Sequence, residues 1–174
     1  MTIQQANQYF AALPDGFADP AQLGALLPAP VQQVQFVGVA GTAGKTAVAR
    51  LLAAILQAQG IRAGAYHAGC EPLAARIRVD GKPVDEVLLC RAADALAAHE
   101  ELPLQAAELA AAAYCFGEAG CTLAVVELPD AGLAAALPQM PVCAVTAVGP
   151  DGVSRSVERL AALAGGVMRK DSIC

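Results

Sequence analysis

Apolar residues fall along this chain in two patterns that alternate, and together they predict strands alternating with helices. Short continuous apolar runs, typical of strands buried inside a sheet, occur at 34–40, 61–68, 122–128 and 141–148. Longer stretches have apolar residues three or four positions apart, which is the spacing of one helix face. These stretches are 2–13, 21–27, 45–59, 85–99, 103–119, 131–137 and 154–165.

Glycine and proline mark where several of these elements are expected to end. The "PAP" at 28–30 should stop the short helix before it, and Gly60 is placed to cap the helix at 45–59. Segment 76–84, "RIRVDGKPV", alternates polar and apolar residues around an Asp-Gly pair, which predicts a hairpin. The apolar side chains expected on one face of the 45–59 helix are Val48, Leu51, Leu52 and Ile55.

The order of elements predicts an α/β fold, in which a mostly parallel sheet is covered by helices on both faces. We expect residues 1–30 to form a helical and loop lead-in, and residues 31–174 to form the α/β domain. Ligands of such sheets bind beyond the carboxyl ends of the strands. Lys45, Glu127 and the 149–152 loop are expected to converge there.

Composition and charge narrow the classes of partner. The chain has 174 residues, a net charge of −5 and only 11 Lys and Arg, so nucleic acid and acidic membranes are not expected partners. No apolar run reaches the ~18 residues of a membrane span, and "MTIQQANQYF" has no export signal, so we expect a cytoplasmic protein. The six cysteines form no C-x-x-C pair, which favours buried apolar thiols over a metal site or disulfides.

The stretch from 41 to 46, "GTAGKT", carries the clearest chemistry. Its glycines let successive backbone N–H groups turn inward around an anion, and the helix that follows adds the positive end of its dipole. Lys45 would reach the terminal phosphates, and Thr46 has the position of a Mg²⁺-binding hydroxyl. Val39 stands where the strict phosphate-loop motif has glycine, so the loop is a variant. The alternative is a strand-to-helix turn that binds nothing.

The chain resembles the N-terminal part of the folylpolyglutamate and dihydrofolate synthases, which belong to the Mur ligase family. Matching segments occur in the family's order over nearly the whole chain, and the arginine-flanked hairpin favours this folate branch over the cell-wall branch. The resembling segments are 6–17, 34–68, 76–84, 110–128, 144–152 and 157–167. The resemblance implies a P-loop NTPase-like fold, only its N-terminal half, without the ligase C-terminal domain.

The same resemblance implies an ATP-dependent ligase that phosphorylates a substrate carboxylate, which the amino group of glutamate then attacks. Its implied cofactors are ATP and Mg²⁺, and its implied partners are a nucleotide, a folate or pterin, glutamate, and a second chain that supplies the missing half. Glu127 matches the family's metal-binding glutamate, and Thr46 and, more weakly, Asp151 are further implied metal ligands. The residues implied to hold ATP are Gly41, Thr42, Ala43, Gly44, Lys45 and Thr46.

Several of the family's metal-binding positions are changed in this chain. Ala68 stands near the position of a metal-ligand serine, Gly152 replaces a metal-ligand histidine, and Ala164 falls where the family carbamylates a lysine. The family's glycine-rich segment after the glutamate is replaced by 128–137. We therefore expect the chain alone to be an incomplete or inactive ligase.

Two other readings stay open. The chain is alternatively a non-catalytic relative that binds a nucleotide, or only a partner, on the same scaffold. A third reading is an unrelated small P-loop kinase or synthetase.

Other polar residues have ordinary structural interpretations. His67 and His99 are expected to be a strand-end and a surface histidine, and Arg76 and Arg78 surface charges on the hairpin. Asp130, in a turn after Pro129, is an ambiguous alternative metal ligand.

Overall fold

The computed structural model describes residues 1–16, 19–99, 102–128 and 131–147. Within these residues the chain forms a six-stranded sheet in the order β4-β3-β2-β5-β1-β6. Strands β2, β5, β1 and β6 run parallel, whereas β3 and β4 are antiparallel to their neighbours, so the predicted mostly parallel sheet is confirmed. The strands are β1 Gln35–Ala40, β2 Ala63–Tyr66, β3 Ile77–Val79, β4 Lys82–Pro83, β5 Leu123–Glu127 and β6 Val142–Val145.

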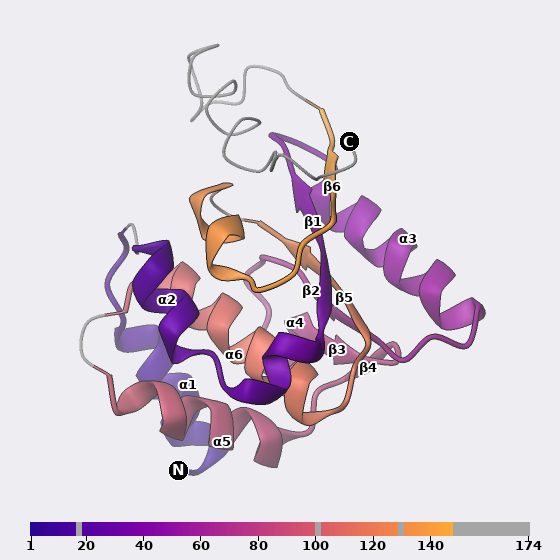
Figure 1. Ribbon diagram of the computed structural model, residues 1–174. Helices are drawn as coiled ribbons and strands as arrows, with labels where there is room; N and C mark the ends of the chain where they lie inside the picture. Colours follow the sequence, from indigo (N-terminus) through magenta and orange to yellow (C-terminus); the bar gives the residue numbers. More distant parts are fainter. Residues whose placement is uncertain (17–18, 100–101, 129–130, 148–174) are drawn as a thin grey trace.

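Helices cover both faces of this sheet, as predicted. Figure 1 shows α3 on one face and α1, α2, α5 and α6 grouped on the other. The α-helices are α1 Ile3–Ala12, α2 Pro20–Leu26, α3 Lys45–Ala58, α4 Leu73–Arg76, α5 Glu86–Ala97 and α6 Leu104–Glu118, and the 3₁₀ helices are η1 Ala29–Gln33 and η2 Ala131–Ala136. The helix expected at 154–165 lies outside the described residues.

Local sequence signals explain several boundaries. Thr2 begins α1 through a capping box with Gln5, since each residue's side chain accepts a hydrogen bond from the other's backbone N–H. Gly60 adopts a positive φ of 73° just after Gln59, the C-cap of α3, and the N–H of Ile61 donates to Leu56 O, so the predicted glycine cap is confirmed. Asp80 and Gly81 both have positive φ between β3 and β4, which confirms the hairpin.

Three short elements differ from the expectation. The "PAP" at 28–30 does end α2, but it also opens η1, because proline is compatible with the first positions of a helix. Residues 131–136 form a 3₁₀ helix rather than an α-helix. The single helical turn α4, just before the hairpin, was not expected. It is too short to show helical spacing, and the proline at its N-cap is the one local signal for it.

The buried face of α3 is rotated from the face predicted. Leu51 is 61% exposed and Ile55 is 49% exposed, whereas Ala49 is buried against Val39 and Val125 of the sheet. Val48 and Leu52 pack beside them as expected. The prediction for Leu51 and Ile55 is wrong because helical spacing alone does not say which flank of a helix meets the sheet.

Helix α6 is buried on nearly every side. It contacts β2 and β3 of the sheet, and α5, α1, α2 and η1 pack around it. Gly64 of β2 lies against the ring of Phe116, where an added Cβ would come within 2.4 Å of the ring. The alanines of α6 therefore let the surrounding elements approach closely. The buried residues of α6 are Ala106, Ala107, Glu108, Leu109, Ala110, Ala111, Ala112, Ala113, Cys115 and Phe116.

The described thiols are mostly buried, as expected. Cys90, Cys115, Cys121 and Cys143 are buried, whereas Cys70 is exposed. Burial raises the pKa of Cys115 to about 12 and the pKa of Cys121 to about 11. No helix within the described ranges is long and apolar enough to cross a membrane.

Candidate functional site

The phosphate-loop sequence connects the carboxyl end of β1 to the start of α3. Gly41 has a φ of 134° and Gly44 a φ of 81°, conformations that L side chains rarely adopt. Gly44 is the N-cap of α3 and contributes no side-chain hydrogen bond to the helix. The first backbone N–H groups of a helix have no intrahelical partner, and here they begin at Lys45, at the edge of the sheet where ligands of α/β folds bind.

Lys45 and Thr46 meet Glu127 at this edge. Thr46 Oγ1 donates a hydrogen bond of 2.8 Å to Glu127 Oε2, and Lys45 Nζ lies 3.8 Å from Glu127 Oε1. Lys45 Nζ also donates to the backbone oxygen of Gly41 at 3.0 Å. The convergence of Lys45 with Glu127 that the sequence predicted is therefore present in the structure. The 149–152 loop, predicted to join them, lies outside the described residues.

The carboxylate of Glu127 is buried at the end of β5, with its side chain 6% exposed. Besides Thr46 and Lys45, it accepts a hydrogen bond of 3.2 Å from the backbone N–H of Ala68. A buried carboxylate needs such partners, because charge is costly away from water. Ala68 has no side-chain oxygen to add to this group, although the family resemblance implies a serine ligand at about this position.

Thr146, which sequence reasoning did not single out, holds the phosphate-loop sequence against the end of β6. Its hydroxyl donates to Ala43 O at 2.7 Å, and the N–H of Thr42 donates to Ala147 O at 2.8 Å. A Cβ on Gly41 would lie 2.2 Å from the Thr146 hydroxyl oxygen. Residues 146 and 147 immediately follow β6, so only the parallel pairing of β6 with β1 brings them here.

The chemistry of the donors suits Mg²⁺. The Thr46 hydroxyl and the Glu127 carboxylate are both oxygen ligands, and Mg²⁺ in nucleotide sites typically uses one or two such protein ligands together with phosphates and water. No group of three His, Cys, Asp or Glu suited to a metal occurs within 1–16, 19–99, 102–128 and 131–147. The other predicted metal-site positions, Asp130, Asp151, Gly152 and Ala164, lie outside these residues.

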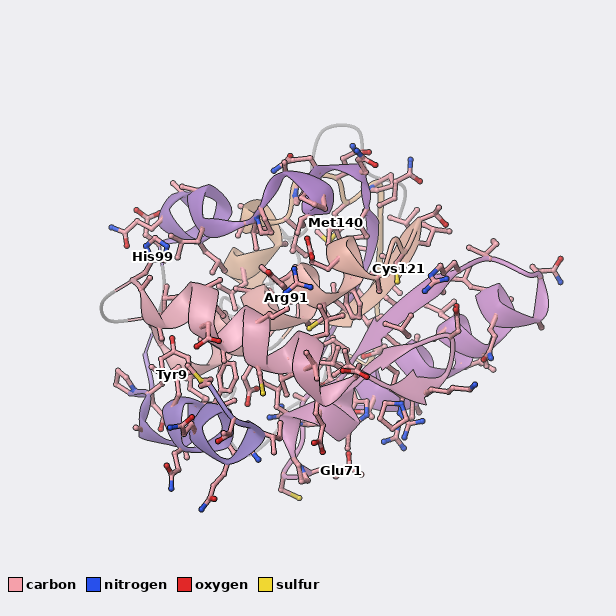
Figure 2. All side chains as sticks on the ribbon, turned by 90° about the horizontal axis from the view of Figure 1, so that it is seen from below. Tyr9, Glu71, Arg91, His99, Cys121 and Met140 are labelled. Atoms are coloured by element: carbon pink, nitrogen blue, oxygen red, sulfur yellow. The ribbon has the colours of Figure 1, made fainter. Side chains whose placement is uncertain are left out.

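A second polar cluster lies beside Ala68. His67 is buried, and its Nε2 lies 3.1 Å from Arg50 NH2. A guanidinium can only donate, so Nε2 accepts and the proton sits on Nδ1, which faces Ala68 O at 3.3 Å. Glu71 Oε2 lies 3.7 Å from Arg50 NH2 and 3.9 Å from His67 Nε2. His67 is a strand-end histidine as expected, and His99 is exposed at the surface, as Figure 2 shows.

Arg76 is not the surface charge that was predicted. It is buried and forms two hydrogen bonds with Glu108, which also accepts a 3.0 Å hydrogen bond from the Tyr66 hydroxyl. Burial lowers the pKa of Arg76, but the hydrogen bonds and charge of Glu108 outweigh it and leave that pKa raised. Burial and then the charge of Glu108 raise the pKa of Tyr66. The expectation failed because Glu108 is 32 residues away in sequence.

Comparison with known proteins finds similarity of structure but not of sequence. No protein-family model matches the chain, and no curated protein matches it significantly. Solved structures do match: Escherichia coli FolC in complex with DHPP and ADP has a TM-score of 0.79 at 23% identity, covering 99% of this chain and 45% of that one.

Two further structures agree. Mycobacterium tuberculosis folylpolyglutamate synthase complexed with ADP has a TM-score of 0.78 at 22% identity, covering 95% of this chain and 41% of that one. A folylpolyglutamate synthase complex with AMPPCP and folate has a TM-score of 0.80 at 21% identity, covering 99% of this chain and 47% of that one. The chain spans about half the length of these proteins. It therefore has the Mur ligase central-domain fold, as found in the N-terminal part of folylpolyglutamate synthases.

Proposed function

We propose that this chain binds MgATP at the 41–46 loop, as the ATP-binding portion of a folylpolyglutamate synthase-like ligase, and that the chain alone does not complete the ligation. The observation that carries the proposal is the meeting of Lys45, Thr46 and Glu127 where β1 and β5 end. Binding a phosphate chain and its metal needs at least a lysine, a hydroxyl and a carboxylate near a glycine-rich helix N-terminus.

Each residue has a distinct role in this proposal. The N–H groups at the start of α3 would donate to phosphate oxygens, and Lys45 would exchange its contact with Gly41 O for the terminal phosphates. Thr46 and Glu127 would hold Mg²⁺, whose role in phosphoryl transfer is to neutralise the phosphates and the developing charge. Thr42, Ala43 and Gly44 would contribute backbone to the cradle.

Incomplete catalysis follows from what surrounds Glu127. Ala68 donates only its backbone N–H there, so one oxygen ligand that the family resemblance implies is lacking. Electrostatic stabilisation is the main contribution of a protein to phosphoryl transfer, and a ligand lost from the metal weakens it directly. The resemblance implies two further losses, at Gly152 and Ala164.

The partners are proposed from the similar structures. FolC was solved with DHPP and ADP, and a folylpolyglutamate synthase with AMPPCP and folate. We propose that a folate or pterin and glutamate are the other substrates wherever the complete ligase is assembled.

Calorimetric titration with MgATP tests the binding part of the proposal. We expect heat of binding for the wild type and for Lys82→Ala, a lysine on the exposed strand β4, and no heat for Lys45→Ala. Folding of each variant is checked by circular dichroism. Absence of binding by wild type, or equal binding by Lys45→Ala, would refute the proposed site.

Turnover is tested separately. The chain is incubated with MgATP, glutamate and either folate or dihydropteroate, and ADP release is measured. We expect no release that depends on the folate or pterin. Substrate-dependent ADP release together with a lengthened product would contradict the expected incompleteness while leaving the nucleotide site intact.

A further inference from the structure

A pocket lies on the α3 face of the sheet, and none of its lining residues belongs to the 41–46 loop. It has a volume of about 390 Å³ and lies between α3, β2 and the β3–β4 hairpin. Arg50 and His67 line it on the side nearer the phosphate loop, because Arg50 follows Thr46 by one turn of α3 and His67 precedes Ala68. Arg78 lines it from the hairpin.

The charge in this pocket is unbalanced. Arg50 and Arg78 contribute two positive charges, Glu71 contributes one negative charge, and His67 is neutral in its contact with Arg50. Arg78 donates through NH1 to Gly81 O, but its buried Nε has no hydrogen-bond partner, and it forms no ion pair with any described residue. A partly buried guanidinium without a counterion favours a bound anion.

Glu71 satisfies Arg50 only loosely. Its carboxylate lies 3.7 Å from the guanidinium, which is longer than a hydrogen bond, and its side chain is 53% exposed. Figure 2 shows Glu71 at the outer edge of the molecule. An exposed carboxylate held this weakly can be displaced by a second carboxylate at little cost, because exposed ion pairs contribute little.

The walls of the pocket are made of small apolar side chains. Ala53 and Ala54 line it from α3, and Ala63 and Ala65 line it from β2. Ala65 pairs with Arg78 in the β2–β3 register, so both side chains point to this face of the sheet. Methyl groups on two opposing walls suit a flat apolar body, and the arginines suit a carboxylate attached to it.

We propose that this pocket is a binding site for a small aromatic monocarboxylate, whose carboxylate pairs with Arg50 and Arg78 and displaces Glu71. Arg50, Arg78 and Glu71 together carry a net charge of +1, so one added carboxylate neutralises the lining even when Glu71 has only turned outward. The site is separate from the nucleotide site and does not depend on nucleotide binding.

Benzoate is the probe for the test, and its binding to the full chain is measured by ligand-observed NMR titration. Arg50→Met and Arg78→Met keep most of the apolar stem and remove the charge, so each should weaken benzoate binding by about tenfold or more. Glu71→Gln should tighten it, because the competing carboxylate is gone. The matched control is Arg91→Met. Arg91 lies on α5, pairs with Glu118 and is well apart from Glu71 in Figure 2, so this variant should bind benzoate like the wild type.

Two further measurements test where benzoate binds and whether its negative charge is required. Benzamidine, a cation of the same shape, should not bind, and Lys45→Met should bind benzoate like the wild type. The proposal is overturned if wild type does not bind benzoate or if both arginine variants bind it normally. It is also overturned if benzamidine binds equally well, or if Lys45→Met alone abolishes binding, which would place the anion in the phosphate loop. Each variant's melting temperature is compared with wild type, so that unfolding is not mistaken for lost binding.

Discussion

Glu108 is a charged residue in the middle of α6, where nearly all its neighbours are apolar. Its two carboxylate oxygens are occupied by Arg76 and Tyr66, so its burial is compensated by hydrogen bonds from three N–H or O–H groups. Neither partner is close to Glu108 in sequence. At the scale of single residues, the chain sequence shows which groups are charged but does not show which of them are buried together.

Glu108→Ala should destabilise the protein strongly, because it leaves the Arg76 guanidinium buried without a counterion. Breaking a buried pair in this way costs about 3–5 kcal/mol of unfolding free energy. Urea denaturation followed by circular dichroism measures it. Glu118→Ala, which breaks the more exposed pair with Arg91, is the control and should cost about 1 kcal/mol or less. Equal effects of the two variants would mean that the buried pair contributes no more than a surface pair.

Gly41→Ala should distort the phosphate loop and abolish MgATP binding. The residue has a φ of 134°, and the new Cβ would lie 2.2 Å from the Thr146 hydroxyl oxygen. Gly60→Ala is the matched control, since Gly60 also has a positive φ but has no atom within 4 Å of the added Cβ. Gly60→Ala should cost about 1–2 kcal/mol of stability and leave nucleotide binding intact. Retained nucleotide affinity in Gly41→Ala would contradict the role given to this loop.

The positions of the secondary structure elements were easier to predict from the sequence than the contacts of single residues. The strands, the hairpin and the long helices follow from local periodicity, caps and turn residues, and these signals act within a few positions. The orientation of α3 was not predictable, because Leu51 and Ile55 have the same apolar spacing as Val48 and Leu52. Which pair packs against the sheet depends on how β1, β2 and β5 are arranged beneath the helix.

Leu51→Ala should change stability by no more than about 0.5 kcal/mol, as is usual for exposed positions. Leu109→Ala, at a fully buried position on α6, should cost about 2–5 kcal/mol. Thermal or urea denaturation of both variants measures the difference. A large loss in Leu51→Ala would show that this flank of α3 is covered by another part of the protein in solution.

The convergence of Lys45 and Glu127 was predictable at the scale of the whole molecule. Lys45 follows β1 through the glycine-rich loop and Glu127 is the last residue of β5, and the carboxyl ends of parallel strands meet at one edge of a sheet. Thr146 was not predictable, because its contact with the loop depends on β6 lying beside β1. The pocket between α3 and the hairpin was not predictable either, since it requires β3 to pair antiparallel with β2 at the edge of the parallel strands.

Stability should fall as pH rises above about 9. Burial raises the pKa of Cys115 to about 12 and that of Cys121 to about 11 from an ordinary value of 9.0, so the unfolded chain loses these protons before the folded chain does. Their stabilising effect is complete below pH 9 and is lost through pH 11 to 12. Urea denaturation at pH 7, 9 and 10 measures the slope. The Cys115→Ala/Cys121→Ala variant should show a shallower slope, and an unchanged slope would assign the effect to other groups.

The packing around α6 sets a limit on how this protein can change over evolutionary time. A helix with neighbours on almost all sides has no face that can accommodate added volume. The alanines of α6 therefore determine how closely the sheet and the surrounding helices can approach this helix. Exchanges to larger residues should be tolerated only when an opposing residue shrinks at the same time. In a collection of divergent homologues, positions 106–113 should therefore vary in correlated pairs, while the exposed flank of α3 varies freely.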